Sequence, residues 1–236
     1  MKPAVFVAAL IGLLAAPSTV PTADEVALRL EGRLRALQSL EARFRQVYAG
    51  QPPAVPIRET GRFYFQKPDR MRWRYEDPEP KDYLYRDGVF SSYFPEDNQM
   101  LVQILSGDEP EAAFLLILAG ARSLRDDYDL ELDSAEAARS AGSWTLRLKP
   151  KAGGEADDAR EILLEVDGKD WLIRRALFKD WAGNASEFAF EGWKTDRRLD
   201  PGLFELKVPD DCEIIRQDGL VPPDRQTDSA EVRIPQ

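Results

Sequence analysis

The stretch RFYFQKPDRMRWRYEDP, residues 62–78, decides the fold because its large apolar side chains recur at every second position. The apolar positions are Phe63, Phe65, Met71, Trp73 and Tyr75, while arginines and a glutamate occupy the even positions from 70 to 76. A period of two predicts half-buried antiparallel strands with one apolar face. Lys67-Pro68-Asp69-Arg70 supplies the turn between two such strands.

Aromatic and basic residues that alternate in this way also raise the question of nucleic acid binding, since aromatic rings stack on bases. Strand alternation, however, sends the rings to one face and the arginines to the other. The chain also has a formal net charge of -10, so its overall field opposes a polyanion. The sequence therefore predicts no nucleic acid partner.

The same strand pattern continues along the chain. Asp87-Gly88 predicts a hairpin turn between strands near residues 83–85 and 89–94. Further strands are predicted at residues 99–105, 128–132, 143–149, 160–166, 172–179 and 186–193. The turns between the later strands contain Gly153-Gly154, Asp167-Gly168 and Gly183-Asn184. Short strands joined by tight turns predict one antiparallel sheet, curled or nearly closed.

Two helical segments are predicted. From residue 24 to 48 the apolar residues recur every three or four positions, which indicates one amphipathic helix, ended by the proline-rich residues 51–56. A second helix is predicted over residues 110–124, and its centre is apolar around nearly the whole circumference. The fold class is thus α+β, mainly antiparallel β. A concave sheet with helices over its opening encloses either a ligand cavity or a filled core, and the sequence leaves both open.

The two ends of the chain differ in composition from the region between them. Residues 1–23 read as a signal peptide, with Lys2 followed by an apolar run from Ala4 to Ala16 that is too short to span a bilayer. The small residues of Ala16-Pro17-Ser18 fit a cleavage site better than a cut after Ala23. Residues 24–216 are predicted to form one folded domain, and the polar, proline-rich residues 217–236 a mobile tail.

The residue types present exclude several chemistries. The chain has no histidine, so Ser–His or Cys–His catalysis and histidine-ligated metal sites are excluded. Cys212 is the only cysteine, which rules out an internal disulfide, and we expect it to be a buried small residue. Acidic runs such as Asp126, Asp127 and Asp129 leave a general acid/base pair open, but such runs are typical of solvated loops. The sequence predicts no enzyme, no metal and no cofactor.

Several short motifs follow one another in a specific order. They are Gly61-Arg62-Phe63-Tyr64-Phe65, Lys67-Pro68, Met71-Arg72-Trp73, Pro78, Asp87-Gly88, Tyr93, Asn98-Gln99, Asp180 with Gly183-Asn184, Leu199-Asp200, Phe204 and Val208-Pro209. Before them come Leu40, Phe44 and Gln46 at the end of the first predicted helix. This succession spans about residues 24–216 and resembles the family of periplasmic outer-membrane lipoprotein carrier proteins, LolA.

The resemblance implies an unclosed half β-barrel whose concave face is covered by helices that act as a lid over a hydrophobic cavity. It implies a monomeric periplasmic chaperone without a cofactor. The partners would be acylated lipoproteins, an inner-membrane lipoprotein-releasing ABC transporter, and an outer-membrane receptor or the outer membrane itself. A lipoprotein-sensing envelope-stress regulator and a carrier of another lipid, both with the same half-barrel, are the alternatives.

The resemblance also implies roles for individual residues. On the sheet, the acyl-chain candidates are Phe63, Phe65, Met71, Trp73 and Tyr75. On the second predicted helix they are Phe114, Leu115 and Leu118. Lys67 takes the place of an arginine that, in the family, bonds toward the lid helix in the closed state. Lysine keeps the charge but lacks the planar fork of donors, so Lys67 is a predicted lid latch of altered geometry.

Overall fold

The computed structural model describes residues 20–104, 123–133, 141–151 and 159–217. The helices are α1 (Ala23–Ala36), α3 (Leu124–Asp127) and the 3-10 helix η1 (Pro201–Phe204). The strands are β1 (Ser39–Ala49), β2 (Ile57–Gln66), β3 (Arg70–Asp77), β4 (Lys81–Arg86), β5 (Val89–Phe94), β6 (Gln99–Ile104), β7 (Tyr128–Leu132), β8 (Ser143–Pro150), β9 (Ala159–Asp167), β10 (Ile173–Asp180), β11 (Ala185–Thr195) and β12 (Glu213–Gln217).

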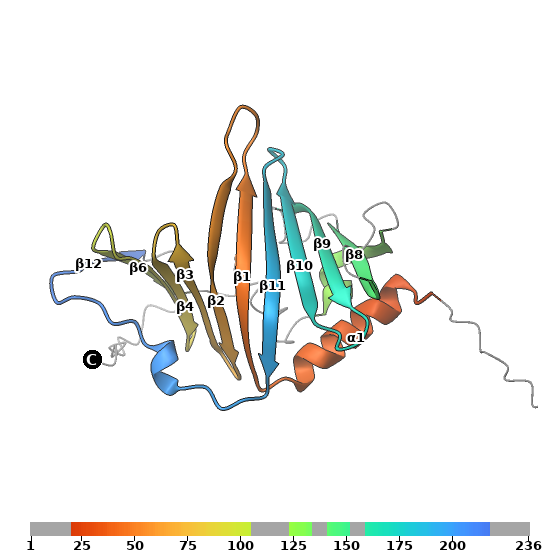
Figure 1. The fold of residues 1–236 in the computed structure, drawn as a ribbon, viewed down its shortest axis with the longest axis horizontal. Helices are drawn as coiled ribbons and strands as arrows, with labels where there is room; N and C mark the ends of the chain where they lie inside the picture. Colours follow the sequence, from red (N-terminus) through yellow and green to blue (C-terminus); the bar gives the residue numbers. More distant parts are fainter. Residues whose placement is uncertain (1–19, 105–122, 134–140, 152–158, 218–236) are drawn as a thin grey trace, which may run out of the picture.

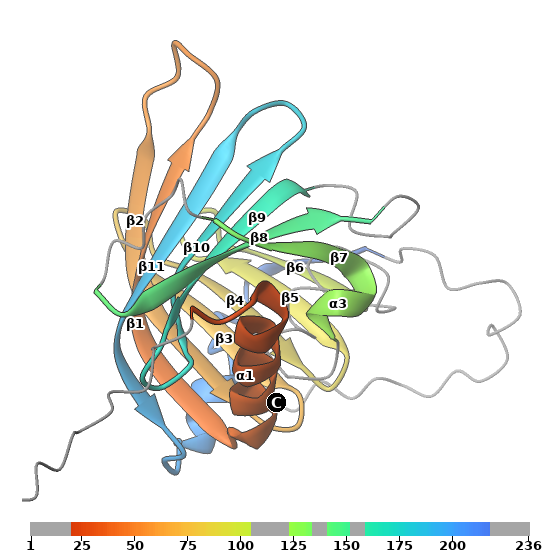
Figure 2. The same cartoon turned by 90° about the vertical axis from the view of Figure 1, so that its right-hand side faces the viewer.

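All twelve strands belong to one curved sheet, in the order β12-β6-β5-β4-β3-β2-β1-β11-β10-β9-β8-β7 (Figure 1). Neighbours are antiparallel except β12 and β6, which are parallel. The order begins at β12 and ends at β7, so these edges do not pair and the barrel stays open. Helix α1 lies across the concave side (Figure 2). The predicted class, a mainly antiparallel half-barrel with a helix over its concave face, is confirmed.

The helix predicted over residues 24–48 is wrong in its second half. Thr22 caps α1 through a reciprocal pair of bonds with Glu25, and the extended backbone of Leu37 ends the helix. The chain then enters β1, in which Phe44 is buried and its neighbours Arg43 and Arg45 are exposed. Phe44 follows Leu40 by four residues, a spacing that fits one helical turn or two steps along a strand equally well. Pairing of β1 with β2 and β11 on its two sides makes it a central strand.

Tight turns and close contacts set the strand register. Asp87 and Gly88 adopt φ of 53° and 80°, as the predicted hairpin between β4 and β5 requires. In β2, Gly61 faces Phe44 of β1, and a Cβ atom there would lie 2.2 Å from the Arg74 carbonyl oxygen and 2.7 Å from the Phe44 ring. Only glycine leaves room for the ring at this position, which places Phe44 over the concave side of the sheet.

The convex face of β2–β4 carries a second, smaller core that the sequence did not indicate. Tyr64 and Leu84 pack there with Leu199 and Phe204 from the segment that follows β11. Arg72 lies on this face, opposite the apolar one as the alternation predicted, but it is only 9% exposed. Its guanidinium donates to the Asp82 carboxylate at 2.7 Å and to the Leu203 carbonyl at 2.8 Å. These bonds satisfy the buried charge and fix the C-terminal segment to the sheet.

Several predictions lie outside the described residues: residues 1–19 of the signal peptide, residues 110–122 of the second helix, the Gly153-Gly154 turn, and the tail from residue 218 onward. Cys212 is partly exposed, so the expectation that it is fully buried is wrong. Desolvation, aided by the carboxylates of Asp211 and Glu213, raises the pKa of its thiol. Among the described helices, none is both long and apolar enough to cross a membrane.

Candidate functional site

The concave face is lined by aromatic rings in direct contact. Five of them, which we call the aromatic floor, come from four neighbouring strands: Phe44, Phe63, Trp73, Phe188 and Phe190. The centroid of Trp73 lies 4.5 Å from that of Phe63, 5.0 Å from that of Phe44 and 5.3 Å from that of Phe188. Such tilted and edge-to-face pairs add about 1 kcal/mol each beyond the area they bury.

Further rings extend the floor toward both sides of the sheet. Tyr83 contacts Tyr75, with 5.6 Å between centroids, and also Phe90 and Phe94 at 6.1 Å. On the other side Phe178 lies 6.1 Å from Phe188. The rings therefore run without interruption from β5 to β10. Those of Tyr83, Phe90, Phe94 and Phe178 are only partly buried, so the apolar surface reaches beyond the part that is fully covered.

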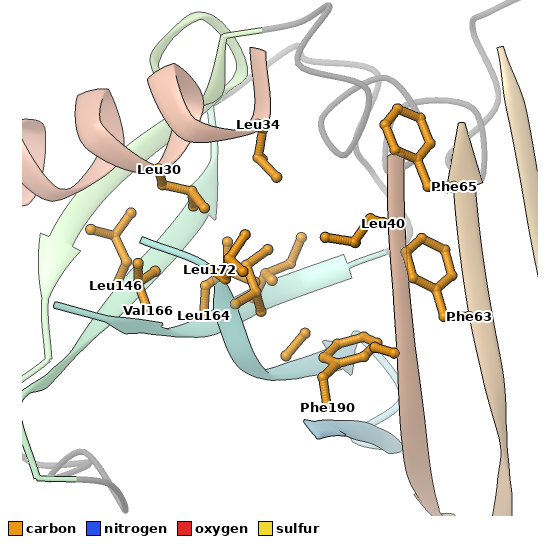
Figure 3. Packing of buried hydrophobic residues seen from close by; sticks show 14 of the residues in the cluster. Leu30, Leu34, Leu40, Phe63, Phe65, Leu146, Leu164, Val166, Leu172 and Phe190 are labelled. Atoms are coloured by element: carbon orange, nitrogen blue, oxygen red, sulfur yellow. The ribbon is translucent and has the colours of Figure 1, made fainter. Parts of the chain in front are cut away.

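Helix α1 closes one part of this face. Its buried stripe consists of Val26, Ala27, Leu30 and Leu34, which are 0–4% exposed. Figure 3 shows Leu30 and Leu34 directed toward sheet residues on the concave side. A cavity of about 10 Å³ remains between helix and sheet, lined by Leu34, Leu40, Phe63, Leu172, Ile173, Ala176, Phe190 and Trp193. That is about the space of one water molecule. Beneath α1, this conformation is closed and filled rather than hollow.

The C-terminal end of α1 is fastened to the sheet by polar contacts. The ammonium of Lys67, in the turn between β2 and β3, donates a hydrogen bond to the Arg35 carbonyl in the last turn of α1. The backbone N–H of Lys67 donates to the Gln38 carbonyl at 3.0 Å. Arg33 donates to the Thr195 hydroxyl at 3.1 Å and lies 3.7 Å from the Asp196 carboxylate. These contacts pin one end of the helix beside the middle of the sheet.

The middle of α1 is joined to α3 through a buried carboxylate. Glu31 is 3% exposed and accepts hydrogen bonds from the Leu124 N–H at 2.8 Å and the Ser123 hydroxyl at 3.2 Å. Arg35 lies 3.7 Å from the same carboxylate. The sequence analysis missed Glu31, although a signal was available: it falls on the apolar stripe, four positions after Ala27. A charged residue within such a stripe needs a specific partner.

A row of polar groups, which we call the polar band, borders the aromatic floor on the concave side. The Tyr75 hydroxyl donates to Gln46 Oε1 at 2.6 Å, and Gln46 Nε2 donates to the Ser186 hydroxyl at 2.9 Å. Lys81 donates to Glu59 at 2.6 Å and lies 4.6 Å from the Tyr75 ring centroid. Burial, with smaller contributions from Tyr83 and Glu59, raises the pKa of Tyr75, which keeps its hydroxyl protonated as a donor. The polar band marks where the apolar surface ends.

The structure places all the predicted sheet residues in one cluster. Phe63, Phe65, Met71, Trp73 and Tyr75 are buried together with the leucines of α1. Phe114, Leu115 and Leu118 lie outside the described residues. The sequence analysis missed the contributions of Phe44, which it placed on a helix, and of Phe188 and Phe190. The alternation of these last two within a predicted strand was the available signal.

These observations define the class of the protein: a helix-covered half-barrel whose concave face is a continuous aromatic surface. The sequence pattern of one family, described as "Outer membrane lipoprotein carrier protein LolA", matches residues 35–207, and the chain belongs to this family.

Individual relatives agree with this assignment. An outer-membrane lipoprotein carrier protein of Methylococcus capsulatus is 27% identical over 186 residues, covering 77% of this chain and 83% of the relative. A protein of the same name from Alkalilimnicola ehrlichii is 26% identical over 224 residues, covering 93% and 98%. Among solved structures, an uncharacterized conserved protein from Thermus thermophilus superposes with a TM-score of 0.54 at 16% identity, covering 83% of this chain and 99% of that chain. This last similarity supports the fold alone.

Proposed function

We propose that the protein is a periplasmic carrier that holds the acyl chains of lipoproteins against the aromatic floor and delivers them to the outer membrane. The observation that carries this proposal is a continuous aromatic surface, one part of which is covered by the C-terminal end of α1. Here, when α1 swings about its fastened C-terminal end, the floor becomes accessible to an apolar ligand.

The energies favour exchange of α1 for an acyl chain. Burying the three large side chains of the stripe, Val26, Leu30 and Leu34, stabilises the closed state by roughly 6 kcal/mol. A palmitoyl chain gains about 0.8 kcal/mol for each buried methylene, or roughly 12 kcal/mol in total. The chain therefore displaces the helix, but the cost of opening removes about half of its binding energy. This reduction makes release to an acceptor possible.

The partners are proposed from membership of the family of outer-membrane lipoprotein carriers. An inner-membrane ABC transporter would release acylated lipoproteins to the carrier, and a receptor in the outer membrane, or that membrane itself, would accept them. The carrier performs no covalent step and needs no cofactor. Lys67 acts as the latch of the closed state, and Phe114, Leu115 and Leu118, which lie outside the described residues, stay proposed acyl-chain contacts.

Release of lipoproteins from membrane vesicles tests the proposal. Inner-membrane vesicles that contain the host's own transporter and a radiolabelled lipoprotein are mixed with the purified protein and ATP, and the label in the supernatant is measured. We expect ATP-dependent release in a complex with the protein. No release overturns the proposal.

The chain offers a matched pair of variants for this assay. Phe90 belongs to the ring network of the concave face, whereas Val89, the preceding residue of β5, points to the convex face, and both are partly buried. Phe90→Glu should lower release at least tenfold and Val89→Glu should leave it within twofold. Mass spectrometry of the bound lipid separates the alternatives, because a carrier of another lipid would retain phospholipid instead of lipoprotein.

A further inference from the structure

Two hairpins project beyond the rest of the sheet and expose apolar side chains. They are the β1–β2 and β10–β11 hairpins, whose ends lie side by side (Figures 1 and 2). The exposed side chains are those of Val55 (82%), Trp181 (67%), Ile57 (52%) and Tyr48 (39%). We call these four residues the apolar tip. Neither the closing of α1 nor the aromatic floor uses them.

The two hairpins form one unit. The backbone N–H of Gln51 donates to Asn184 Oδ1 at 3.2 Å, which joins the end of one hairpin to the end of the other. Gly183 has a φ of 85°, and a Cβ atom there would lie 2.3 Å from the Gln51 side chain. Glycine at this position therefore permits both the turn and the close approach. The apolar side chains of the two hairpins are thus presented together.

The charge distribution around the tip is unusual for this chain. Although 31% of the residues are charged, none from Gln46 to Ile57 is. Arginines lie on both sides of this uncharged stretch: Arg45, which pairs with Glu191 at 2.6 Å, and the exposed Arg58. An apolar end flanked by arginines matches the profile of a bilayer, with apolar chains inside and phosphate-bearing headgroups outside.

The backbone of the tip is suited to a medium poor in water. Three of the six residues from Gln51 to Pro56 are prolines, which have no N–H group. The N–H of Gln51 is bonded to Asn184, and that of Ala54 donates to the Gln51 carbonyl at 3.0 Å. In the neighbouring hairpin the N–H groups of Gly183 and Asn184 both donate to Asp180. Few donors would lose a water partner on entry into a membrane interface.

We propose that the apolar tip docks on a lipid bilayer, with Val55 and Trp181 inserted at the headgroup level and Arg45 and Arg58 facing anionic headgroups. Tryptophan and tyrosine are the side chains that favour this layer. The end of the β1–β2 hairpin carries no charge, and both oxygens of Asp180, in the neighbouring turn, accept hydrogen bonds from Asn184. Such an end suits a fluid lipid surface better than a protein partner, which would supply polar groups to match. Tyr48 lies on the same face of β1 as Phe44, beyond Gln46 of the polar band, so docking brings this edge of the concave face to the membrane. Docking by the tip is a role separate from the proposed cargo binding, and it gives the protein a direct contact with its acceptor membrane.

Co-sedimentation with liposomes tests the proposal without any cargo. The protein, purified in the mature form that the cell accumulates, is mixed with sucrose-loaded vesicles of phosphatidylethanolamine and phosphatidylglycerol. We expect wild-type protein to bind, and the double variant Val55→Glu/Trp181→Glu to bind at least tenfold more weakly. Leu28→Glu is the matched control, because Leu28 is also an exposed apolar residue (44%) but lies on α1. It should bind within twofold of wild type.

Three results would show that the apolar tip does not dock on lipid. Wild-type protein that stays in the supernatant at all lipid concentrations overturns the proposal, as does equal binding by the double variant and wild type. Binding to native membranes that is lost after protease treatment, with none to pure liposomes, identifies a protein partner instead.

Quenching of tryptophan fluorescence by brominated lipid gives a separate readout. The quenching should fall in Trp181→Phe, which keeps an apolar ring and should still sediment with vesicles.

Discussion

The replacement Leu34→Ala separates a helix that opens from a helix that is part of a fixed core. Leu34 is 4% exposed and lines the cavity of about 10 Å³ between α1 and the sheet. The substitution removes three carbon atoms, worth roughly 2.4 kcal/mol of burial at about 0.8 kcal/mol each. The existing cavity grows at the same time, which brings the loss to about 3 kcal/mol.

Leu34→Ala lowers the free energy of unfolding whether or not α1 opens, but only an opening helix also changes the affinity for a ligand of the floor. If α1 opens independently, the closed state loses about 3 kcal/mol relative to the open one, which shifts that equilibrium roughly 140-fold. The apparent affinity of an apolar fluorescent dye for the floor then rises by up to the same factor, because a larger fraction of the protein is open. Amide exchange in α1 accelerates accordingly, and the free energy of global unfolding falls by the same amount as the opening equilibrium shifts, because both are measured from the closed state.

Titration with N-phenylnaphthylamine and urea unfolding measure these quantities on the same samples. The matched control is Leu84→Ala, because Leu84 is a buried leucine (7% exposed) of the convex core that does not touch α1. It should lower the free energy of unfolding by about 2–5 kcal/mol, the usual cost of a buried leucine, and leave dye affinity unchanged. An unchanged dye affinity in Leu34→Ala, together with a fall of about 3 kcal/mol in global stability, would refute the idea that α1 is a lid.

Three further predictions concern single residues. Gly61→Ala should lower the free energy of unfolding by about 3 kcal/mol in urea titrations, because the new Cβ meets a backbone oxygen. Its control is Gly32→Ala in α1, where nothing lies within 4 Å of the new Cβ; this variant should raise the free energy of unfolding by up to about 1 kcal/mol. Lys67→Met should raise dye affinity severalfold by removing the bond to the Arg35 carbonyl, and Lys67→Arg should restore it; equal affinity in all three proteins would contradict the latch. Hydrogen bonds, chiefly from the Asn184 side chain, lower the pKa of Asp180 from its ordinary 3.8, so the ionised carboxylate adds stability above about pH 4 that is lost as the pH falls through the lowered pKa. Asp180→Asn should therefore show a smaller loss of stability than wild type between about pH 5 and pH 2, and parallel curves would argue against this role.

The features that depend on local periodicity and turn residues were predicted correctly from the sequence. The alternation from Phe63 to Tyr75 placed these side chains correctly on one face, and Asp87-Gly88 placed the hairpin between β4 and β5. The second half of the first helix was misassigned because Leu40 and Phe44 fit both periods. The pairing of residues 39–49 with β2 and β11, which are distant in sequence, makes this segment a strand.

The other omissions have the same origin. Tyr64 has the parity of an exposed residue and is buried only because Phe204, far along the chain, packs on the convex face. The junction of the two hairpins depends on a hydrogen bond between Gln51 and Asn184, which no local sequence pattern predicts. Contacts between segments distant in sequence thus determine both the second core and the apolar tip.

In the proposed function, acyl chains occupy the concave face of the sheet once α1 has opened. Photo-crosslinking of a triacylated lipopeptide that carries a diazirine within one acyl chain tests it directly, with the modified residues identified by mass spectrometry. We expect adducts on the aromatic floor, at Phe44, Phe63, Trp73 and Phe188, and fewer adducts in Phe90→Glu. Adducts confined to the convex face around Tyr64 and Phe204, or none above the level seen with unfolded protein, would contradict it.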